Sequence, residues 1–192
     1  MMVNKMKHPK HHRGNAPQQL GVAVLTVSST RTMDTDTSGH WMTKRIDKEG
    51  HRLQAHLIIP DNQELIKKTV LDLTNQSKVN VILITGGTGL SPNDITIEAV
   101  TPLFTKLIPA FGYIFSYLSY EEIDSAAILS RATAGCIDTT VVFCMPGSLK
   151  AVKLACKALI FSELHHICHH LFEKKMHEED KGIKLDEQCL DY

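Results

Sequence analysis

Three short runs of apolar, largely β-branched residues constrain the fold of this chain more than any other feature. The runs are Gly21–Val27, Val79–Thr85 and Thr139–Met145. They lack the regular polar and apolar alternation of a strand with one solvated face, so each is expected to be a strand buried on both faces. Strands of that kind occur mainly in parallel sheets whose two faces are covered by helices. The runs therefore predict a mostly parallel central sheet.

Helical patterns separate these strands. We expect a fourth strand, nearer the sheet edge, at Arg52–Ile59. We also expect three main helices, at Ser38–Glu49, Gln63–Asn75 and Leu149–Phe172. An alternation of strand and helix is typical of βαβ units. The segment between Pro102 and Gly135 differs, because it holds more aromatic residues than one sheet-covering helix needs. Part of it is expected to cover a second subunit.

Composition limits the classes of protein to which this chain can belong. A chain of 192 residues that is 43% hydrophobic suffices for one globular domain, expected at 20–173 between flexible tails at 1–19 and 174–192. Lys plus Arg equals Asp plus Glu at 21 each, so no overall field attracts nucleic acid or an anionic membrane. We find no signal peptide or membrane-spanning run and expect a cytoplasmic protein with reduced cysteines.

Small and polar residues follow each predicted strand. In an open parallel sheet, ligands bind outside the carboxyl ends of the strands, where the loops converge. The loops in question are Ser28-Ser29-Thr30-Arg31, Pro60-Asp61, Gly86-Gly87-Thr88-Gly89 and Pro146-Gly147-Ser148.

The glycine loop is suited to an anion. Glycines reach positive φ without strain, so successive N–H groups can turn inward and a phosphate or carboxylate can approach the backbone closely. The pattern matches neither the Walker loop nor the dinucleotide fingerprint. A tight turn without any ligand is the alternative.

Asp94 is expected to open a helix over Asp94–Val100, where an aspartate commonly caps the N-terminus. A carboxylate beside a phosphate would also repel it unless a cation lay between them, and Mg²⁺ commonly bridges the two. Asp94, with Asp61 across the rim, is therefore a candidate Mg²⁺ ligand. The plainer alternatives are a helix cap for Asp94 and a turn acid for Asp61.

Two further groups carry weaker signals. His166 and His170 lie four residues apart on the polar side of the last predicted helix, where we expect solvated surface and no structural zinc. Ser130 and Arg131 offer a cation that suits either phosphate binding or a surface salt bridge.

The segments TGGTGLSPNDITIEA, FGYIFSYLSYEEIDSAAILSRATAG and VVFCMPGSLKAVKLA resemble the MoaB/MogA family of molybdenum cofactor biosynthesis proteins. The resemblance extends from about Leu20 to Phe172 and is closer to the MoaB branch. It implies a three-layer α/β fold, with a mostly parallel sheet between helices, and assembly as trimers or hexamers. It also implies a molybdopterin site at the strand ends and, in active members, Mg²⁺- and ATP-dependent adenylylation of molybdopterin.

The resemblance also assigns roles to individual residues. Asp61 and Asp94 match the family's functional acids and are the expected catalytic residues and Mg²⁺ ligands. Gly86, Gly87, Thr88 and Gly89 match its phosphate-binding loop, and Ser148 matches the serine of its PGS motif. The strand-end loops and the cationic pair add the other expected substrate-binding residues, which are Ser28, Ser130, Arg131, Pro146 and Gly147.

Several positions depart from the family pattern. Ser29 replaces a usual Asp, Asn93 a usual Arg and Ile97 a usual Pro, while Tyr113 and Ser116 stand in the segment that is usually GFGE followed by FR. Several of these changes remove charge from the expected pocket. Two functions therefore stay open: a molybdopterin adenylyltransferase, or a catalytically weak or inactive protein that binds or carries the pterin. A domain related to CinA, which shares the glycine motif, is a third and weaker candidate.

Overall fold

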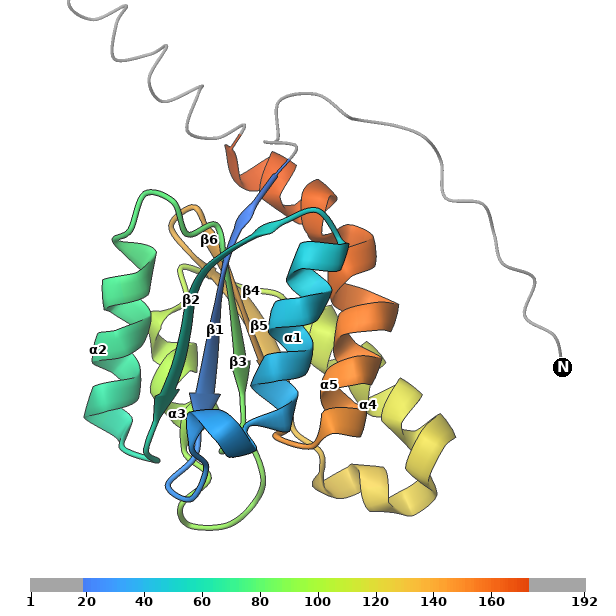
Figure 1. Ribbon diagram of the computed structural model, residues 1–192. Coiled ribbons are helices and arrows are strands. Elements are labelled where there is room, and N and C mark those ends of the chain that lie inside the picture. The colour runs from blue at the N-terminus through green and yellow to red at the C-terminus, as the bar shows by residue number, and fades with distance from the viewer. Residues whose placement is uncertain (1–18, 173–192) are drawn as a thin grey trace, which may run out of the picture.

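The computed structural model describes residues 19–172 and contains a six-stranded sheet in the order β2-β1-β3-β6-β5-β4 (Figure 1). Apart from Gln19, the predicted tails lie outside the described residues. The mostly parallel α/β architecture that the sequence predicts is confirmed. In the described part of the chain, no helix is long and apolar enough to cross a membrane.

The four predicted strands form the parallel part of the sheet. They are β1 (Gly21–Val27), β2 (Arg52–Ile59), β3 (Val81–Thr85) and β6 (Thr140–Met145). β1 and β3 pair so that Thr26 lies opposite Thr85, and β3 and β6 pair so that Thr85 lies opposite Met145. The carboxyl ends of these three strands are therefore level. β2 is an edge strand, as its weaker pattern indicates.

Two strands of the sheet were not predicted. β5 (Thr133–Ile137) runs antiparallel to β6, and the two-residue β4 (Lys106–Leu107) runs antiparallel to β5. The turn from β5 to β6 places Asp138 at a φ of 50°, a conformation that aspartate tolerates better than most residues. The short TAGCI run carries no alternation that would separate it from the aromatic segment before it.

Helices cover both faces of the sheet and create two cores (Figure 1). One face carries α1 (Thr37–Lys48), α4 (Pro109–Ile123) and α5 (Leu149–Ala155), and the other carries α2 (Gln63–Thr74) and α3 (Thr96–Val100). Short 3₁₀ helices complete the connections at η1 (Met33–Thr35), η2 (Thr101–Leu103) and η3 (Asp124–Leu129).

The predicted start of α3 is wrong. The helix begins at Thr96, not at Asp94, and the Asp94 carboxylate does not cap it. Oδ2 of Asp94 instead accepts a hydrogen bond from the amide of Ser91 at 2.9 Å. A local turn that closes on the carboxylate therefore replaces the expected first helical turn.

The last predicted helix also differs from a regular α-helix. After α5 it contains a π-helical segment, η4 (Cys156–Ile160), before residues 161–172 continue as an α-helix. Leu164, Cys168 and His169 are buried there, while His166 and His170 are exposed with their Nε2 atoms 3.0 Å apart. The absence of structural zinc stays a prediction.

The described cysteines are all buried and unpaired, as expected of small apolar side chains. Burial raises the pKa of the Cys156 and Cys168 thiols to about 12, and it raises the pKa of the Cys144 thiol further. Cys189 lies outside the described residues.

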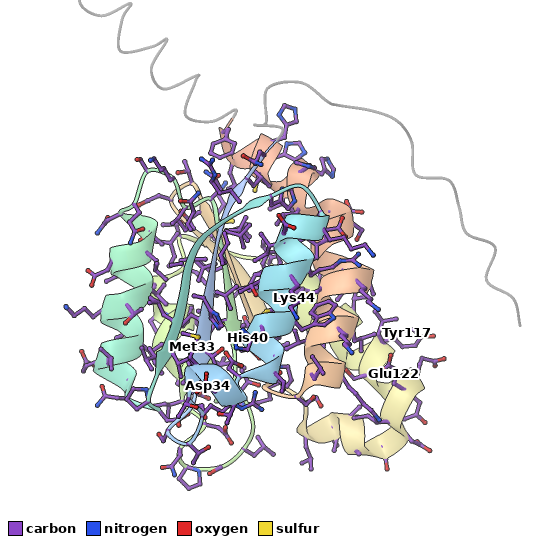
Figure 2. The ribbon with its side chains drawn as sticks, in the orientation of Figure 1. Met33, Asp34, His40, Lys44, Tyr117 and Glu122 are labelled. Atoms are coloured by element: carbon purple, nitrogen blue, oxygen red, sulfur yellow. The ribbon has the colours of Figure 1, made fainter. Side chains whose placement is uncertain are left out.

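The aromatic side chains of α4 divide between core and surface. Phe111 and Phe115 are buried against the sheet, whereas Tyr113, Tyr117 and Tyr120 are 76%, 63% and 55% exposed. Figure 2 shows Tyr117 pointing away from the domain. Exposed aromatic surface of this extent is typical of a protein interface.

We expect the chain to form a trimer, or a hexamer built from trimers, with this α4 face buried between copies. Sedimentation at micromolar concentration should give that mass, and Tyr117→Glu should shift it towards the monomer because a charge would be buried. Lys44→Glu, on the exposed side of α1, should leave the mass unchanged. A wild-type monomer would contradict the prediction.

Candidate functional site

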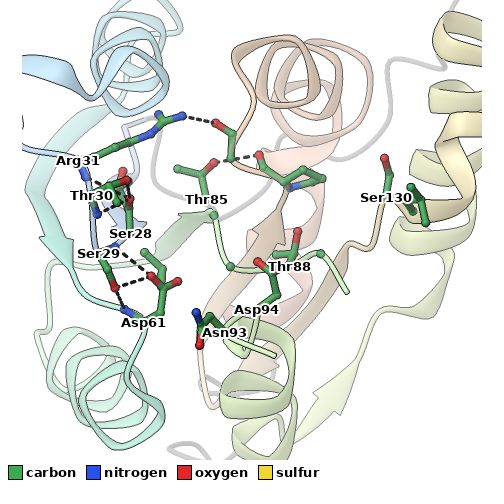
Figure 3. A pocket seen from close by; sticks show the side chains of 18 residues that line it. Ser28, Ser29, Thr30, Arg31, Asp61, Thr85, Thr88, Asn93, Asp94 and Ser130 are labelled. Carbon is green, nitrogen blue, oxygen red and sulfur yellow. Dashed lines mark hydrogen bonds between the residues drawn. The ribbon is translucent and has the colours of Figure 1, made fainter. Parts of the chain in front are cut away.

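A cavity of about 480 Å³ lies at the edge where the parallel strands end (Figure 3). The loops after β1, β2, β3 and β6 all contribute to its wall, as expected from the level strand ends. Most of the predicted site residues line it: Ser28, Asp61, Gly86, Gly87, Thr88, Gly89, Asp94, Ser130, Pro146 and Gly147.

Close backbone approach forces glycine into the loop after β3. Gly86 has a φ of 96°, and a Cβ there would lie 2.2 Å from the carbonyl oxygen of Val27. Gly87 has a φ of 60°, and a Cβ there would lie 2.4 Å from Oγ1 of Thr96. Any other residue at either position would combine backbone strain with a steric clash.

The carbonyl groups of this loop are fully occupied. Oγ1 of Thr96 donates to Gly86 O at 2.8 Å, and the Thr96 amide donates to Gly87 O at 2.9 Å. Arg131 donates to the next two carbonyls, Thr88 O at 2.8 Å and Gly89 O at 2.7 Å. Four successive peptide groups thus have their oxygens held from outside the loop.

The N–H groups on the same peptides have no such partners. Among residues 19–172, the amides of Gly87, Thr88, Gly89 and Leu90 donate to no acceptor. Consecutive free amides in a glycine-rich turn form an anion-binding concavity. The loop therefore has the polarity that a phosphate or carboxylate requires.

Asp61 lies beside the first glycines of the loop. Its Oδ2 accepts hydrogen bonds from the amide and the hydroxyl of Ser29, at 2.9 and 2.7 Å. Its Oδ1 accepts none from the described residues and lies 3.2 Å from the place that a Cβ on Gly87 would occupy. Ser29, a departure from the family pattern, thus orients this carboxylate without adding a second one.

Asp94 has the same arrangement at the other end of the loop. Its Oδ2 accepts from Ser91 and lies 2.8 Å from the place of a Cβ on Gly89, while no described residue donates to Oδ1. Each acid therefore keeps one carboxylate oxygen available beside the free amides. Figure 3 shows Asp61 and Asp94 on the cavity wall, with Asn93 labelled near both.

Beneath the loop after β1 lies a buried polar network centred on Asp36. Its carboxylate accepts from Thr26 Oγ1 at 2.6 Å and from the Gly39 amide at 2.9 Å, and it lies 3.0 Å from Nε2 of His56. Burial alone would raise the pKa of Asp36, but these hydrogen bonds and the His56 charge outweigh it and hold the pKa below its ordinary value. The carboxylate therefore stays ionised.

Arg31 connects this network to the cavity. NH1 lies 3.5 Å from Oδ1 of Asp36, and NH2 donates to the carbonyl of Gly147 at 3.2 Å. Arg31 is the cationic side chain among the residues that line the cavity. It was not among the predicted site residues, although its place in the same loop as Ser28 was a usable signal.

Two predicted substrate-binding residues do not line this cavity. Ser148 caps α5, where its Oγ accepts from the Ala151 amide at 3.2 Å. Arg131 binds the glycine loop from behind and pairs with Glu98, so of its two expected roles the structure shows the ion pair. Both Arg131 and Ser130 line a neighbouring cavity of about 330 Å³, together with Tyr113 and Ser116 of α4.

The remaining cavity residues were not among the predicted site residues. Thr26, Val27, Ser29, Thr30, Thr85 and Asn93 come from the same strand ends and their loops, and Leu129 ends η3.

A mostly parallel sheet that is covered on both faces, with free amides and acids at the carboxyl ends of its strands, has its cavity where open α/β proteins bind their ligands. A family model described as a probable molybdopterin binding domain matches residues 23–166. This chain belongs to that family of molybdenum cofactor biosynthesis proteins, which confirms the resemblance and the fold, and its role lies in molybdenum cofactor biosynthesis.

Individual relatives agree with this assignment. Molybdenum cofactor biosynthesis protein B of Bacillus subtilis (strain 168) is 45% identical, over 86% of this chain and 98% of the relative. A crystal structure of a molybdenum cofactor biosynthesis protein B is 43% identical, with a TM-score of 0.80 over 82% of this chain and 99% of the other. The tungsten cofactor synthesizing protein MoaB from Pyrococcus furiosus is 36% identical, with a TM-score of 0.73 over 81% and 99%.

We expect Asp36→Asn to destabilise the protein by on the order of 1–3 kcal/mol at neutral pH, because charge-assisted hydrogen bonds are lost. The pKa of Asp36 is lowered by folding, so its contribution is complete above the unfolded pKa of about 3.9 and is lost as pH falls through the folded pKa. Urea unfolding from pH 7 to pH 3 should show the two proteins converging at the acid end.

Asp34→Asn is the matched control, since Asp34 is exposed two residues away. It should follow the wild-type stability curve throughout. A constant gap between wild type and Asp36→Asn at every pH would show that the carboxylate charge contributes nothing.

Proposed function

We propose that the protein is a Mg²⁺-dependent adenylyltransferase that joins AMP from ATP to the terminal phosphate of molybdopterin. The observation that carries the proposal is the row of free amides on residues 87–90, flanked at either end by an acid with an available carboxylate oxygen. Two ionised carboxylates would repel an anion bound beside them unless a cation lay between the carboxylates and the anion.

The two carboxylates of Asp61 and Asp94 suit Mg²⁺ better than they suit a metal whose ligands are all protein side chains. Within residues 19–172, no group of three or more His, Cys, Asp or Glu side chains could hold a metal ion. Mg²⁺ is usually bound by one or two carboxylates together with phosphate oxygens and several waters. Asp61 and Asp94 would hold the ion, which when bound would neutralise charge that develops on the transferring phosphate.

The proposed reaction needs no covalent intermediate on the protein. An oxygen of the pterin phosphate attacks the α-phosphorus of ATP, a new oxygen–phosphorus bond forms, and the bond to the bridging β-oxygen breaks. Pyrophosphate leaves with the electron pair. The free amides bind and orient phosphate oxygens, and the level strand ends bring the two acids to the same site, so positioning and electrostatics supply the catalysis.

The charge of the cavity also supports a second candidate, a protein that binds or carries molybdopterin without turning over ATP. Arg31 is the cationic residue of the wall, and its guanidinium is already engaged by Asp36 and Gly147. Tyr113 and Ser116, which depart from the usual family residues, add no charge to the neighbouring cavity. A triphosphate would thus rely on backbone amides and Mg²⁺ for most of its neutralisation.

One assay separates the two candidates. The purified protein is incubated with molybdopterin, Mg²⁺ and ATP, while pyrophosphate and adenylylated pterin are measured. Formation of both products in equal amounts supports the enzyme. Retention of the pterin with no pyrophosphate above background supports the carrier.

We expect Asp94→Asn to separate stability from activity. The amide oxygen can still accept from Ser91, so the melting temperature should change little. Removing the charge should lower the rate about a hundredfold or more, which corresponds to about 2.7–4 kcal/mol of transition-state stabilisation. Asp94→Ala should also lose the turn hydrogen bond and about 1 kcal/mol of stability. Rates and thermal melts of both variants check this.

Asp61→Asn should behave as Asp94→Asn does, because its amide can still pair with Ser29 while the charge disappears. Asp47→Asn, which changes an exposed acid of α1 that does not line the cavity, controls for the change in net charge. Normal Mg²⁺-dependent turnover in Asp94→Asn would rule out its role as a metal ligand.

A further inference from the structure

We propose that Arg131 is a positioning residue, held by Glu98, that sets the orientation of the glycine-loop amides that face the phosphate. The idea rests on the proposed phosphate site, but it concerns a side chain that would not touch substrate. It assigns Arg131 a role different from the direct phosphate binding that the sequence left open for it.

The contacts of Arg131 are directed at the back of the glycine loop. Nε donates to Thr88 O at 2.8 Å and NH2 donates to Gly89 O at 2.7 Å. NH1 donates to Oε1 of Glu98 at 2.6 Å, and NH2 lies 3.4 Å from Oε2 of the same carboxylate. Most of the N–H donors of the guanidinium are therefore committed to the loop and to one acid.

Because a peptide group is planar, fixing the direction of its carbonyl also fixes the direction of its N–H. The described chain has no cis peptide bond, so in each peptide group the C=O and the following N–H point in opposite directions. Holding the oxygens of Thr88 and Gly89 towards Arg131 turns the N–H groups of Gly89 and Leu90 away from it. Arg131 lies outside the wall of the main cavity, whereas Thr88 and Gly89 line it.

Thr96 does the same for the first half of the loop, through its contacts with the oxygens of Gly86 and Gly87. Thr96 is the first residue of α3, so its position is set by the helix. The second half has no secondary structure to fix it, because the loop continues through Leu90 to Asp94 as turns. Arg131, which comes from beyond η3, supplies the missing constraint.

The ion pair explains why an arginine is suited to this position. A planar guanidinium can bind two consecutive carbonyls with one edge and a carboxylate with another, whereas a lysine ammonium cannot reach all three. The hydrogen bond from Arg131 lowers the pKa of Glu98, so Glu98 is ionised at neutral pH and holds the guanidinium in place. The Glu98 carboxylate is on α3, which also carries Thr96, so one short helix anchors both halves of the loop.

The test is direct binding of inorganic pyrophosphate by calorimetry, with no turnover required. Arg131→Lys retains the charge but cannot hold both carbonyls, and we expect pyrophosphate to bind about tenfold more weakly or worse. Glu98→Gln should weaken binding by a smaller factor, because the loop carbonyls keep their partner. Lys44→Ala, which removes an exposed cation from α1, should bind as the wild type does.

A second measurement separates positioning from a general loss of structure. In Arg131→Gly, guanidinium ions at millimolar concentration should restore pyrophosphate binding by occupying the space left by the Arg131 guanidinium group, whereas methylammonium ions should not. A crystal structure of Arg131→Lys should show the peptide group after Thr88 or Gly89 rotated, with its N–H no longer facing the cavity.

The outcomes distinguish this idea from the proposed function. Weaker binding in Arg131→Lys supports it even if the wild type forms no adenylylated pterin. Unchanged binding in Arg131→Lys overturns it and leaves the adenylyltransferase proposal intact. A wild-type protein that binds no pyrophosphate would overturn it as well, because the amides would then have no phosphate to face.

Discussion

The level pairing of β1, β3 and β6 is the constraint on which the rest of this structure depends. Because Thr26, Thr85 and Met145 lie side by side in parallel strands, the loops that follow them begin at the same height. Residues from five separate parts of the chain meet at this edge of the sheet, although helices and strands separate them in sequence. Burial of both sheet faces holds that alignment, since a shift in register would disrupt the close packing of both faces against their helices.

The site is built mainly from backbone, and side chains contribute by fixing the backbone. Thr85 donates to Pro146 O at 3.0 Å, which joins the loop after β3 to the loop after β6. Thr96 and Arg131 hold the glycine-loop carbonyls, and Arg31 holds the carbonyl of Gly147. Because the loop oxygens are bonded from outside, the backbone amides are the hydrogen-bond donors that this part of the cavity offers, in place of a cluster of basic residues.

Local patterns in the sequence predicted the parts of this structure that local chemistry decides. Unbroken Val and Ile runs specified the buried strands, and the glycine cluster specified the tight turn. β5 was missed because the TAGCI run owes its strand structure to its pairing with β6. The helix cap expected at Asp94 does not form, because the Asp94 carboxylate accepts a hydrogen bond from the Ser91 amide instead.

The acidic partner of Arg131 lies 33 residues earlier in the chain, which explains why the arginine looked unpaired. The connection of Arg31 to Gly147 spans 116 residues and is equally invisible to short-range patterns. Such contacts follow only from the sheet topology. The position of the site residues at the ends of the strands could therefore be predicted from the sequence, whereas the contacts that define their individual roles could not.

The buried cysteines give the molecule internal reporters of local opening. With their pKa raised to about 12 or higher, the thiols of Cys144, Cys156 and Cys168 hold almost no thiolate at neutral pH while they are packed. Alkylation would therefore proceed only through transient exposure, at a rate set by the free energy of opening around each sulfur. Cys144 reports on the central sheet, Cys156 on the π-helical segment and Cys168 on the final helix. The order in which they react would rank these three regions of the unmodified chain by their free energy of local opening.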